Sequence, residues 1–145
     1  MTTQRFDLPD WESFDHLRET TIGRICIIDN GCPLAIPVNF LVAGARDNYT
    51  IVMRTAPETM LGRYEGPASL EVDHIDIAGG HAWSVFVRGT VRRVLGSHDL
   101  PDPRPIVDHG RYQWMVLQPS AMSGRRFVVK AADDGYFVEW QFAAG

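Results

Sequence analysis

The chain has 145 residues, of which 45% are hydrophobic, and this is enough apolar material for one domain with a single core. Lysine and arginine number 14 against 18 aspartates and glutamates, so the net charge is −4 and there is no basic surplus to hold nucleic acid or an acidic membrane surface. No apolar run approaches the ~20 residues that span a bilayer, and the N-terminus lacks the apolar segment of a signal peptide, so we expect a cytoplasmic protein.

The start of the chain predicts a loose arm and one short helix. Residues 1–9 show no periodic pattern. Over residues 10–20, Phe14 and Leu17 recur at helical spacing, and Asp10 is a suitable N-cap. We therefore expect a small amphipathic helix that packs on the rest of the domain.

A hairpin with two cysteines follows the helix. Residues 22–28 and 34–42 are strand-like runs separated by a turn at Asn30-Gly31. With a two-residue turn, Cys26 and Cys32 point to opposite sides of the sheet. We expect two free thiols, with Cys26 buried, and no zinc site, because two cysteines alone do not complete one.

The third strand ends in an arginine and leads into a turn with helix-capping chemistry. Residues 49–54 form a β-type run, and Thr55 and Glu58 then fit a capping box that begins a short helix over residues 57–64. Free backbone N–H groups at such a helix start, beside the guanidinium of Arg54, suit a phosphate. An ordinary strand-to-helix turn with a surface arginine is the alternative interpretation.

The second half of the chain is rich in strands. Strand-like runs are predicted over residues 68–75, 82–95, 112–118, 126–129 and 136–142. Residues 97–110 read as an irregular loop, and residues 119–124 as another. We expect Arg88 to form a salt bridge with Glu71 or Asp73 on the adjacent strand.

Strands dominate this order and their connections are short. The pattern favours one mainly-β domain over residues 1–145, an antiparallel barrel with small helices packed on it. No Ser/His/Asp order, nucleophile elbow or zinc motif is present in the sequence, so no catalytic residue can be named. His74 and His81 straddle a turn, but no third ligand supports a metal or haem pair there, and we expect no metal site.

Five stretches carry a resemblance to a known family. They are Gly23-Arg24-Ile25, Pro37-Val38-Asn39-Phe40, Arg54 to Leu61, Glu71-Val72-Asp73 with Trp83 to Gly89, and Gly124-Arg125-Arg126. In order and at family spacing, these stretches resemble the pyridoxamine 5′-phosphate oxidase-like superfamily of flavin-binding split β-barrels, most of all its short bacterial members. The resemblance implies an antiparallel split barrel that forms a homodimer, with flavin mononucleotide (FMN) in a groove between the subunits.

The resemblance also implies which residues contact the cofactor. The strand matching Pro37, Val38 and Asn39 lies along the isoalloxazine ring in such proteins, and the residues matching Arg54 and Thr55 hold the phosphate. The full set of implied cofactor contacts is Pro37, Val38, Asn39, Arg54, Thr55, Thr59, Met60, Leu61, Trp83, Ser84 and Arg125.

Met60 departs from the family pattern. Many FMN-binding relatives have a lysine there that helps to neutralise the phosphate, and the only lysine of this chain is Lys130. Losing one charge-assisted contact costs about 1.5–3 kcal/mol, or about one to two decades in affinity. Arg63 is a candidate replacement.

The expected function is that of a small FMN-dependent oxidoreductase acting on a small-molecule substrate that the sequence does not name. Residues 114–119 lack the substrate-binding arginine of the vitamin-making oxidases, so we do not expect oxidation of pyridoxamine phosphate. One alternative is a reductase that uses the deazaflavin coenzyme as a dissociable cosubstrate. Another is a non-catalytic flavin- or haem-binding member, or a degenerate member of the family.

Overall fold

The computed structural model describes residues 5–96, 98–104, 110–128, 130–132 and 135–137, and this part of the chain is mainly β. The strands are β1 (Arg5–Asp7), β2 (Ile22–Asp29), β3 (Cys32–Ala45), β4 (Asn48–Thr55), β5 (Gly66–Asp76), β6 (His81–Val94), β7 (Gln113–Val128), β8 (Lys130–Ala132) and β9 (Gly135–Phe137). One helix, α1 (Asp10–Glu19), and one 3-10 turn, η1 (Leu61–Arg63), accompany them. None of the described helices is long and apolar enough to cross a membrane.

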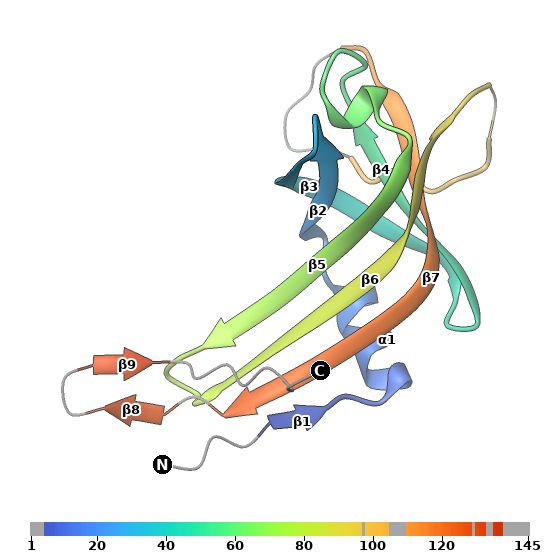
Figure 1. Ribbon diagram of the computed structural model, residues 1–145. Helices are drawn as coiled ribbons and strands as arrows, with labels where there is room; N and C mark the ends of the chain where they lie inside the picture. The colour runs from blue at the N-terminus through green and yellow to red at the C-terminus, as the bar shows by residue number, and fades with distance from the viewer. Residues whose placement is uncertain (1–4, 97, 105–109, 129, 133–134, 138–145) are drawn as a thin grey trace.

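Seven of these strands form one sheet, and six of them, β2 to β7, close into a ring. They pair antiparallel in the order β1-β7-β4-β3-β2-β5-β6, and β6 also pairs with β7, so the sheet closes on itself. Figure 1 shows that β5, β6 and β7 run on beyond the ring as a long three-stranded projection, with β1 beside β7 and α1 packed near its base. The prediction of an antiparallel split barrel is confirmed.

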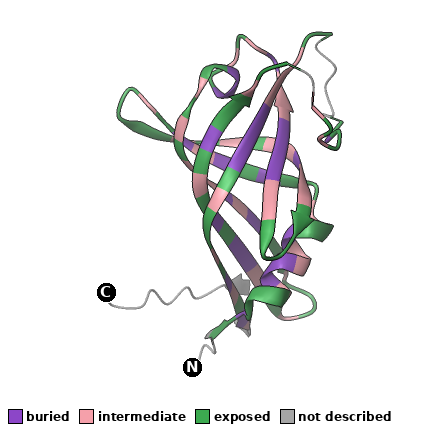
Figure 2. Ribbon diagram, turned by 90° about the vertical axis from the view of Figure 1, so that its right-hand side faces the viewer, coloured by how far each residue is buried: buried purple, intermediate pink, exposed green. Residues whose placement is uncertain are grey.

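The core lies inside the ring and follows from the alternation of the strands. Along β6, Val85, Val87 and Val91 are buried while Phe86 and Arg88 are exposed, as the sequence pattern predicts. Buried and exposed segments alternate in this way around the ring in Figure 2. Leu17 of α1 joins the same buried cluster, so the helix is fixed to the barrel by its apolar stripe.

The N-terminal arm and the helix start differ from the prediction. Residues 5–7 pair with β7 as strand β1, so this part of the arm is not loose. Pro9, with extended backbone angles, precedes the helix as its N-cap, and Asp10 lies one position later in the first turn. A carboxylate there still interacts favourably with the positive end of the helix dipole.

The predicted helix over residues 57–64 is wrong. The chain forms a turn there, followed only by η1, because the side chain of Thr59 competes for the backbone groups that a helix would use. Its hydroxyl donates to the carbonyl of Ala56 at 2.7 Å and accepts the N–H of Gly62 at 3.0 Å. The helix start with free N–H groups is therefore absent from this segment.

The predicted loop over residues 119–124 is also wrong, because β7 continues through it. The register of β6 and β7 shifts at Arg88 and Gly89: Gly89 lies opposite Pro119 and Arg88 lies opposite Ala121, which leaves Ser120 as the extra residue of a bulge. A bulge is where a strand tolerates a proline, since no ladder hydrogen bond from its nitrogen is needed. The hydroxyl of Ser120 donates to the carbonyl of Arg88 at 3.2 Å.

The cysteine hairpin has the predicted register. Cys26 lies opposite Ala35 and Cys32 opposite Asp29, and both thiols are free. Cys26 is half-buried rather than buried, because it points to the outer face of the ring, while its neighbours Ile25 and Ile27 point inward.

Candidate functional site

Arg54 lies on the outer face of the ring, near the end of β4. Met53 points inward and packs in the core, so its neighbour Arg54 points outward, opposite Trp114 of β7. The side chain of Arg54 is nonetheless only 16% exposed. A guanidinium so enclosed needs partners, and the surroundings of Arg54 supply two kinds.

The first partner is an aromatic ring and the second is a carboxylate. The guanidinium carbon of Arg54 lies 3.7 Å from the centroid of Tyr112 and 5.8 Å from that of Trp114. Its Nη1 donates to Oδ2 of Asp102 at 2.8 Å, while its Nε is buried without a hydrogen-bond partner among the described residues. Stacking fixes the plane of the guanidinium, and a fixed plane with one oxyanion bound is suited to recognising carboxylates and phosphates.

The segment after Arg54 brings two hydroxyls together. Oγ1 of Thr55 and Oγ1 of Thr59 are 3.0 Å apart. The Met60 side chain is 45% exposed, and Leu61 is buried in the core. The structure thus places Thr55 and Thr59 next to one another, whereas Leu61 offers a ligand only its backbone.

The strand of Pro37, Val38 and Asn39 presents alternate residues to the outside. Val38 packs against the core, whereas Pro37 is exposed on the outer face and Asn39 lies on the same face. Arg24 of β2 lies directly opposite Pro37. This part of the outer face therefore carries a cation that the sequence analysis did not assign to it.

Arg24 takes the carboxylates that were predicted to pair with Arg88. Its Nη1 lies 2.9 Å from Glu71 and 3.3 Å from Asp73, because β2 and β5 are neighbours and place Arg24 opposite Glu71. The pKa of Glu71 is raised, first by burial and then by its hydrogen bond with Asp73. The expected Arg88 salt bridge is thus replaced by this cluster.

Trp83 and Ser84 point to opposite sides of β6. The Trp83 ring is stacked on His16 of α1, with 4.1 Å between centroids and 16° between planes, so it faces the helix. Ser84 is buried on the other face, where it lies opposite Arg125 of β7. Arg125 in turn lies opposite Asp7 of β1.

Comparison with known proteins identifies the family. The family model described as pyridoxamine 5′-phosphate oxidase matches residues 9–126. The chain belongs to the pyridoxamine 5′-phosphate oxidase-like family. No curated protein matches it.

Solved structures agree with this family. The FAD binding protein from Mycobacterium smegmatis is 27% identical, with a TM-score of 0.66 over 86% of this chain and 99% of that one. A putative pyridoxamine 5′-phosphate oxidase from Corynebacterium glutamicum is 24% identical, with a TM-score of 0.67 over 88% and 97% of the two chains. An FAD-binding protein from Mesorhizobium loti is 18% identical, with a TM-score of 0.66 over 87% and 98%. The last two likenesses concern the fold alone.

In this member of the pyridoxamine 5′-phosphate oxidase-like family, the groups around Arg54 and around Arg125 lie near opposite ends of β6, while Pro37, Val38 and Asn39 lie on β3. Val94 lies opposite Trp114, the neighbour of Arg54, while Ser84 lies opposite Arg125. Val94 and Ser84 are ten positions apart on one strand, which at about 3.3 Å per residue is about 33 Å. Within a single copy of the chain, Arg54 and Arg125 are thus far apart along β6.

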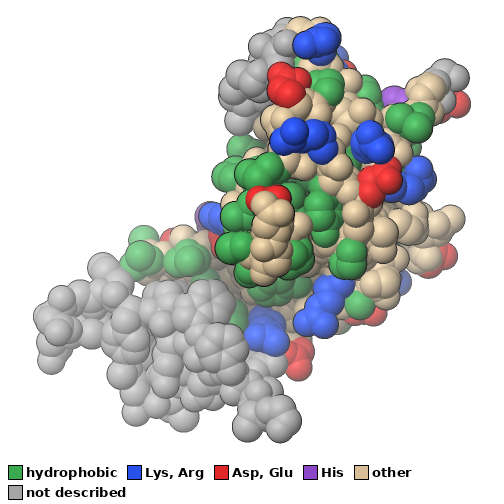
Figure 3. Space-filling view, turned by 45° about the horizontal axis from the view of Figure 1, so that its top comes forward, with side chains coloured by type: hydrophobic (Ala, Val, Ile, Leu, Met, Phe, Trp, Pro, Cys, Tyr) green, Lys and Arg blue, Asp and Glu red, His purple; other side chains and the backbone are tan. Residues whose placement is uncertain are grey.

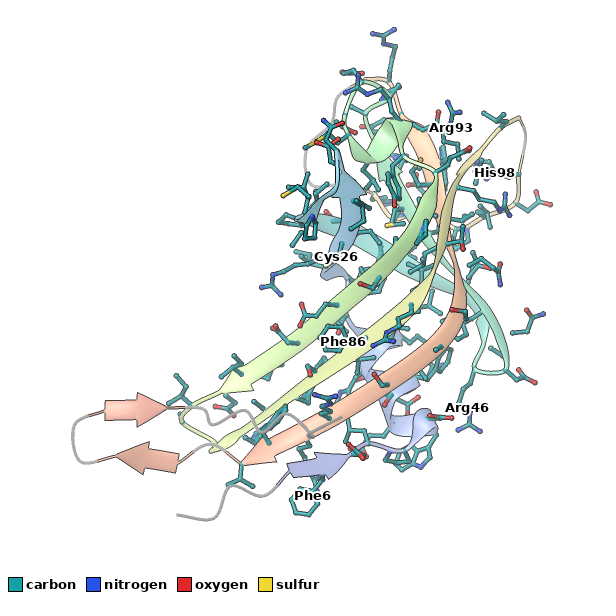
Figure 4. All side chains as sticks on the ribbon, in the orientation of Figure 1. Phe6, Cys26, Arg46, Phe86, Arg93 and His98 are labelled. Atoms are coloured by element: carbon teal, nitrogen blue, oxygen red, sulfur yellow. The ribbon has the colours of Figure 1, made fainter. Side chains whose placement is uncertain are left out.

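The outer face also carries exposed large apolar side chains on either side of the Arg24–Glu71–Asp73 cluster. Ile22 and Ile28 of β2 are each 51% exposed, Ile75 of β5 is 45% exposed and Phe86 of β6 is 38% exposed. Figure 3 shows hydrophobic side chains gathered on the side where Figure 1 places the β2–β3 hairpin. Figure 4 labels Phe86 part-way along the long strands and Cys26 on the hairpin. Side chains of this size, exposed together on one sheet face, are typical of a contact surface.

The histidines do not form a metal site in the described part of the chain. His74 lies opposite Trp83 and His81 opposite Asp76, so the two histidines do not face one another across the turn. No group of three or more metal-ligating side chains occurs among the described residues.

Sequence reasoning missed the residues that surround Arg54. Tyr112 was assigned only to a strand, and Asp102 to a solvated loop. The sequence gives no local pattern that pairs Asp102 with Arg54, because the two residues are 48 positions apart and Asp102 lies in neither a helix nor a strand.

Proposed function

We propose that this protein binds a flavin nucleotide by its phosphate at Arg54 and acts as a small flavin-dependent oxidoreductase, with FMN as the cofactor. The observation that carries the proposal is the guanidinium of Arg54, which is fixed over Tyr112 and already bound to an oxyanion of Asp102. A carboxylate and a phosphate present similar oxygen acceptors to such a group. The position is the one that the family resemblance assigns to the cofactor phosphate.

Neighbouring groups support the same assignment. The hydroxyls of Thr55 and Thr59 lie 3.0 Å apart in the turn that directly follows Arg54, and the Thr55 hydroxyl can rotate from Thr59 to donate to a phosphate oxygen. Met60 supplies no charge there, and Arg63, exposed at the end of η1, is the nearest cation in sequence.

We infer that two copies of the chain share the cofactor groove. Arg54 and the Ser84–Arg125 pair are about 33 Å apart along one copy, so the second group reaches the same flavin only from a partner. The exposed face around Ile22, Ile28 and Phe86 supplies apolar surface for such a contact. A homodimer with the groove at its interface follows, and sedimentation at micromolar concentration tests it: a monomer would remove half of the groove.

The flavin supplies the redox chemistry when bound, and the chain supplies binding and exclusion of water. Arg54, Thr55 and Thr59 hold the phosphate. Pro37 and Asn39 line the side of the ring from the outer face of β3, where Pro37 gives a flat apolar surface and Asn39 a polar contact.

Flavin titration of a matched pair of variants tests the proposal. Arg54→Ala should weaken FMN binding by about one to two decades, because one charge-assisted contact is lost. Arg46→Ala, on the exposed turn between β3 and β4, removes the same charge elsewhere and should change nothing. Unchanged FMN affinity in Arg54→Ala would refute the phosphate assignment, and turnover with reduced nicotinamide would establish the oxidoreductase.

FAD is the second candidate cofactor. The Mycobacterium smegmatis protein at 27% identity is an FAD binding protein. Each phosphate of a pyrophosphate carries about one negative charge, against about two for a terminal phosphate, so FAD asks for less neutralisation where Met60 replaces a lysine. Parallel titrations with FMN, FAD and the deazaflavin coenzyme decide among the three cofactors. If none of them binds, the protein is a degenerate member of the family.

A further inference from the structure

The contact between Arg54 and Asp102 joins two parts of the chain that no strand pairing connects. Arg54 ends a barrel strand, and Asp102 lies in residues 98–104, which form neither helix nor strand. The side chain of Asp102 is 43% exposed and that of Arg54 only 16%. The carboxylate is therefore the more exposed partner of the pair and covers part of the guanidinium.

The carboxylate is held in a defined turn. Oδ1 of Asp102 accepts the backbone N–H of Arg104 at 2.9 Å, while Oδ2 accepts Nη1 of Arg54 at 2.8 Å. Both oxygens are thus used, one to shape the loop and one to bind Arg54. An aspartate that bonds the backbone two residues on is a local turn device, and here it also presents a negative charge to the arginine.

We propose that Asp102 is an internal competitor for the anion site at Arg54 and sets the affinity with which that site binds the flavin phosphate. The inference rests on the proposed function in naming the flavin, but the competition itself concerns any phosphate. Since Nε of Arg54 is buried, an incoming phosphate binds at the Nη groups, where Asp102 already accepts a hydrogen bond from Nη1, so the carboxylate and the phosphate compete for the same edge of the guanidinium.

Competition of this kind has a specific signature. When only the unpaired fraction of the protein can bind, the apparent dissociation constant rises by the inverse of that fraction, whatever the ligand. Every anion that binds at Arg54 is therefore weakened by the same factor. Riboflavin, which has no phosphate, is not weakened at all.

A positioning role for Asp102 makes the opposite prediction. If the carboxylate served only to hold the guanidinium in place, its removal would loosen Arg54 and weaken phosphate binding. Tyr112 already fixes the guanidinium plane at 3.7 Å, so removal of Asp102 leaves Arg54 with a support of its own. The sign of the change in affinity thus separates competition from positioning.

The test compares Asp102→Asn and Asp102→Ala with Asp99→Asn in the full chain. Asp99 is an exposed carboxylate in the same loop, so its variant matches the change in charge without touching Arg54. Calorimetric titration should show FMN and inorganic phosphate each binding about three- to tenfold more tightly to both Asp102 variants, by the same factor. Riboflavin affinity and the Asp99→Asn protein should not change, and the gain should vanish in the double variant with Arg54→Ala.

Inorganic phosphate keeps this proposal separate from the flavin assignment. The Nε–H resonance of Arg54 in an NMR spectrum reports phosphate at the guanidinium even if no flavin binds. If no flavin binds but inorganic phosphate binds more tightly to the Asp102 variants, the proposed function would be overturned, whereas the proposed role of Asp102 as a competitor would stand. Weaker or unchanged phosphate binding in both Asp102 variants would overturn the competitor.

Discussion

Gly124 of β7 is the position where the helix approaches the sheet most closely, and substitution there should separate them. An ideal Cβ on Gly124 would lie 2.2 Å from Oγ of Ser13, 3.1 Å from Cβ of Ser13 and 3.2 Å from Cβ of Leu8. The backbone of Gly124 also accepts the N–H of Leu8 at 2.9 Å, which ties the start of the helix to the strand. Gly124→Ala therefore forces the hydroxyl of Ser13 out of its place and presses the new methyl group against the Cβ atoms of Ser13 and Leu8.

The magnitude follows from overpacking and from the state of Ser13. Forcing an extra methyl group into a packed contact costs about 1–3 kcal/mol, and we expect Gly124→Ala to lower the free energy of unfolding by this amount. The hydroxyl of Ser13 is buried with no hydrogen-bond partner among the described residues. Ser13→Ala removes that hydroxyl and its desolvation penalty, so it should raise the free energy of unfolding by about 1 kcal/mol.

A double-mutant cycle measured by urea unfolding at fixed protein concentration tests this reasoning. Because the nearest atom to the new Cβ is Oγ of Ser13, the double variant should lose clearly less stability than the two single effects predict. The proposed contact would be refuted if the stability changes of the two single variants add to within about 0.5 kcal/mol in the double variant. It would also be refuted if the Gly124→Ala protein is as stable as the parent.

Two further predictions concern the outer face of the ring. The raised pKa of Glu71 means that the folded state binds its proton more tightly than the unfolded state, so stability falls as the pH rises from the unfolded pKa through the folded one. Glu71→Gln has no carboxyl group to titrate, so its stability lacks this fall. In urea unfolding, the stability of Glu71→Gln relative to the parent should therefore increase from pH 4 to pH 7. A difference in stability between the two proteins that is the same at both pH values would contradict this prediction. Cys32 is exposed and Cys26 half-buried, so a thiol reagent should label Cys32 first in the native protein, and equal rates would contradict this difference in exposure.

Much of the barrel could be predicted because its signals are local. The alternation along residues 82–95 and the turn at Asn30-Gly31 each fix a strand or a register from adjacent residues, and both agree with the structure. Two local signals misled. The apparent capping box at Thr55 and Glu58 does not begin a helix, because the hydroxyl of Thr59 bonds to the backbone and forms a turn. Pro119 lies at a bulge within β7 and not at the end of the strand.

The candidate site is less accessible from sequence because its contacts are distant along the chain. The resemblance selects Arg54, and the structure places it on the outer face, but its partners Asp102 and Tyr112 come from a later loop and from the residue just before β7. The pairing of Arg24 with Glu71 likewise depends on β2 lying beside β5, which no local pattern indicates. Strand neighbours of this kind are set by the closure of the whole ring.

The position of β7 in the ring also governs when the protein can fold. Residues 113–128 pair with β1, β4 and β6, so the barrel cannot close until this strand has been synthesised. Until then, β4 and β6 are made but unpaired along these edges, and contacts of such wide sequence separation form slowly. Newly synthesised chains therefore pass through a stage with open strand edges, the stage at which β proteins are most prone to aggregate.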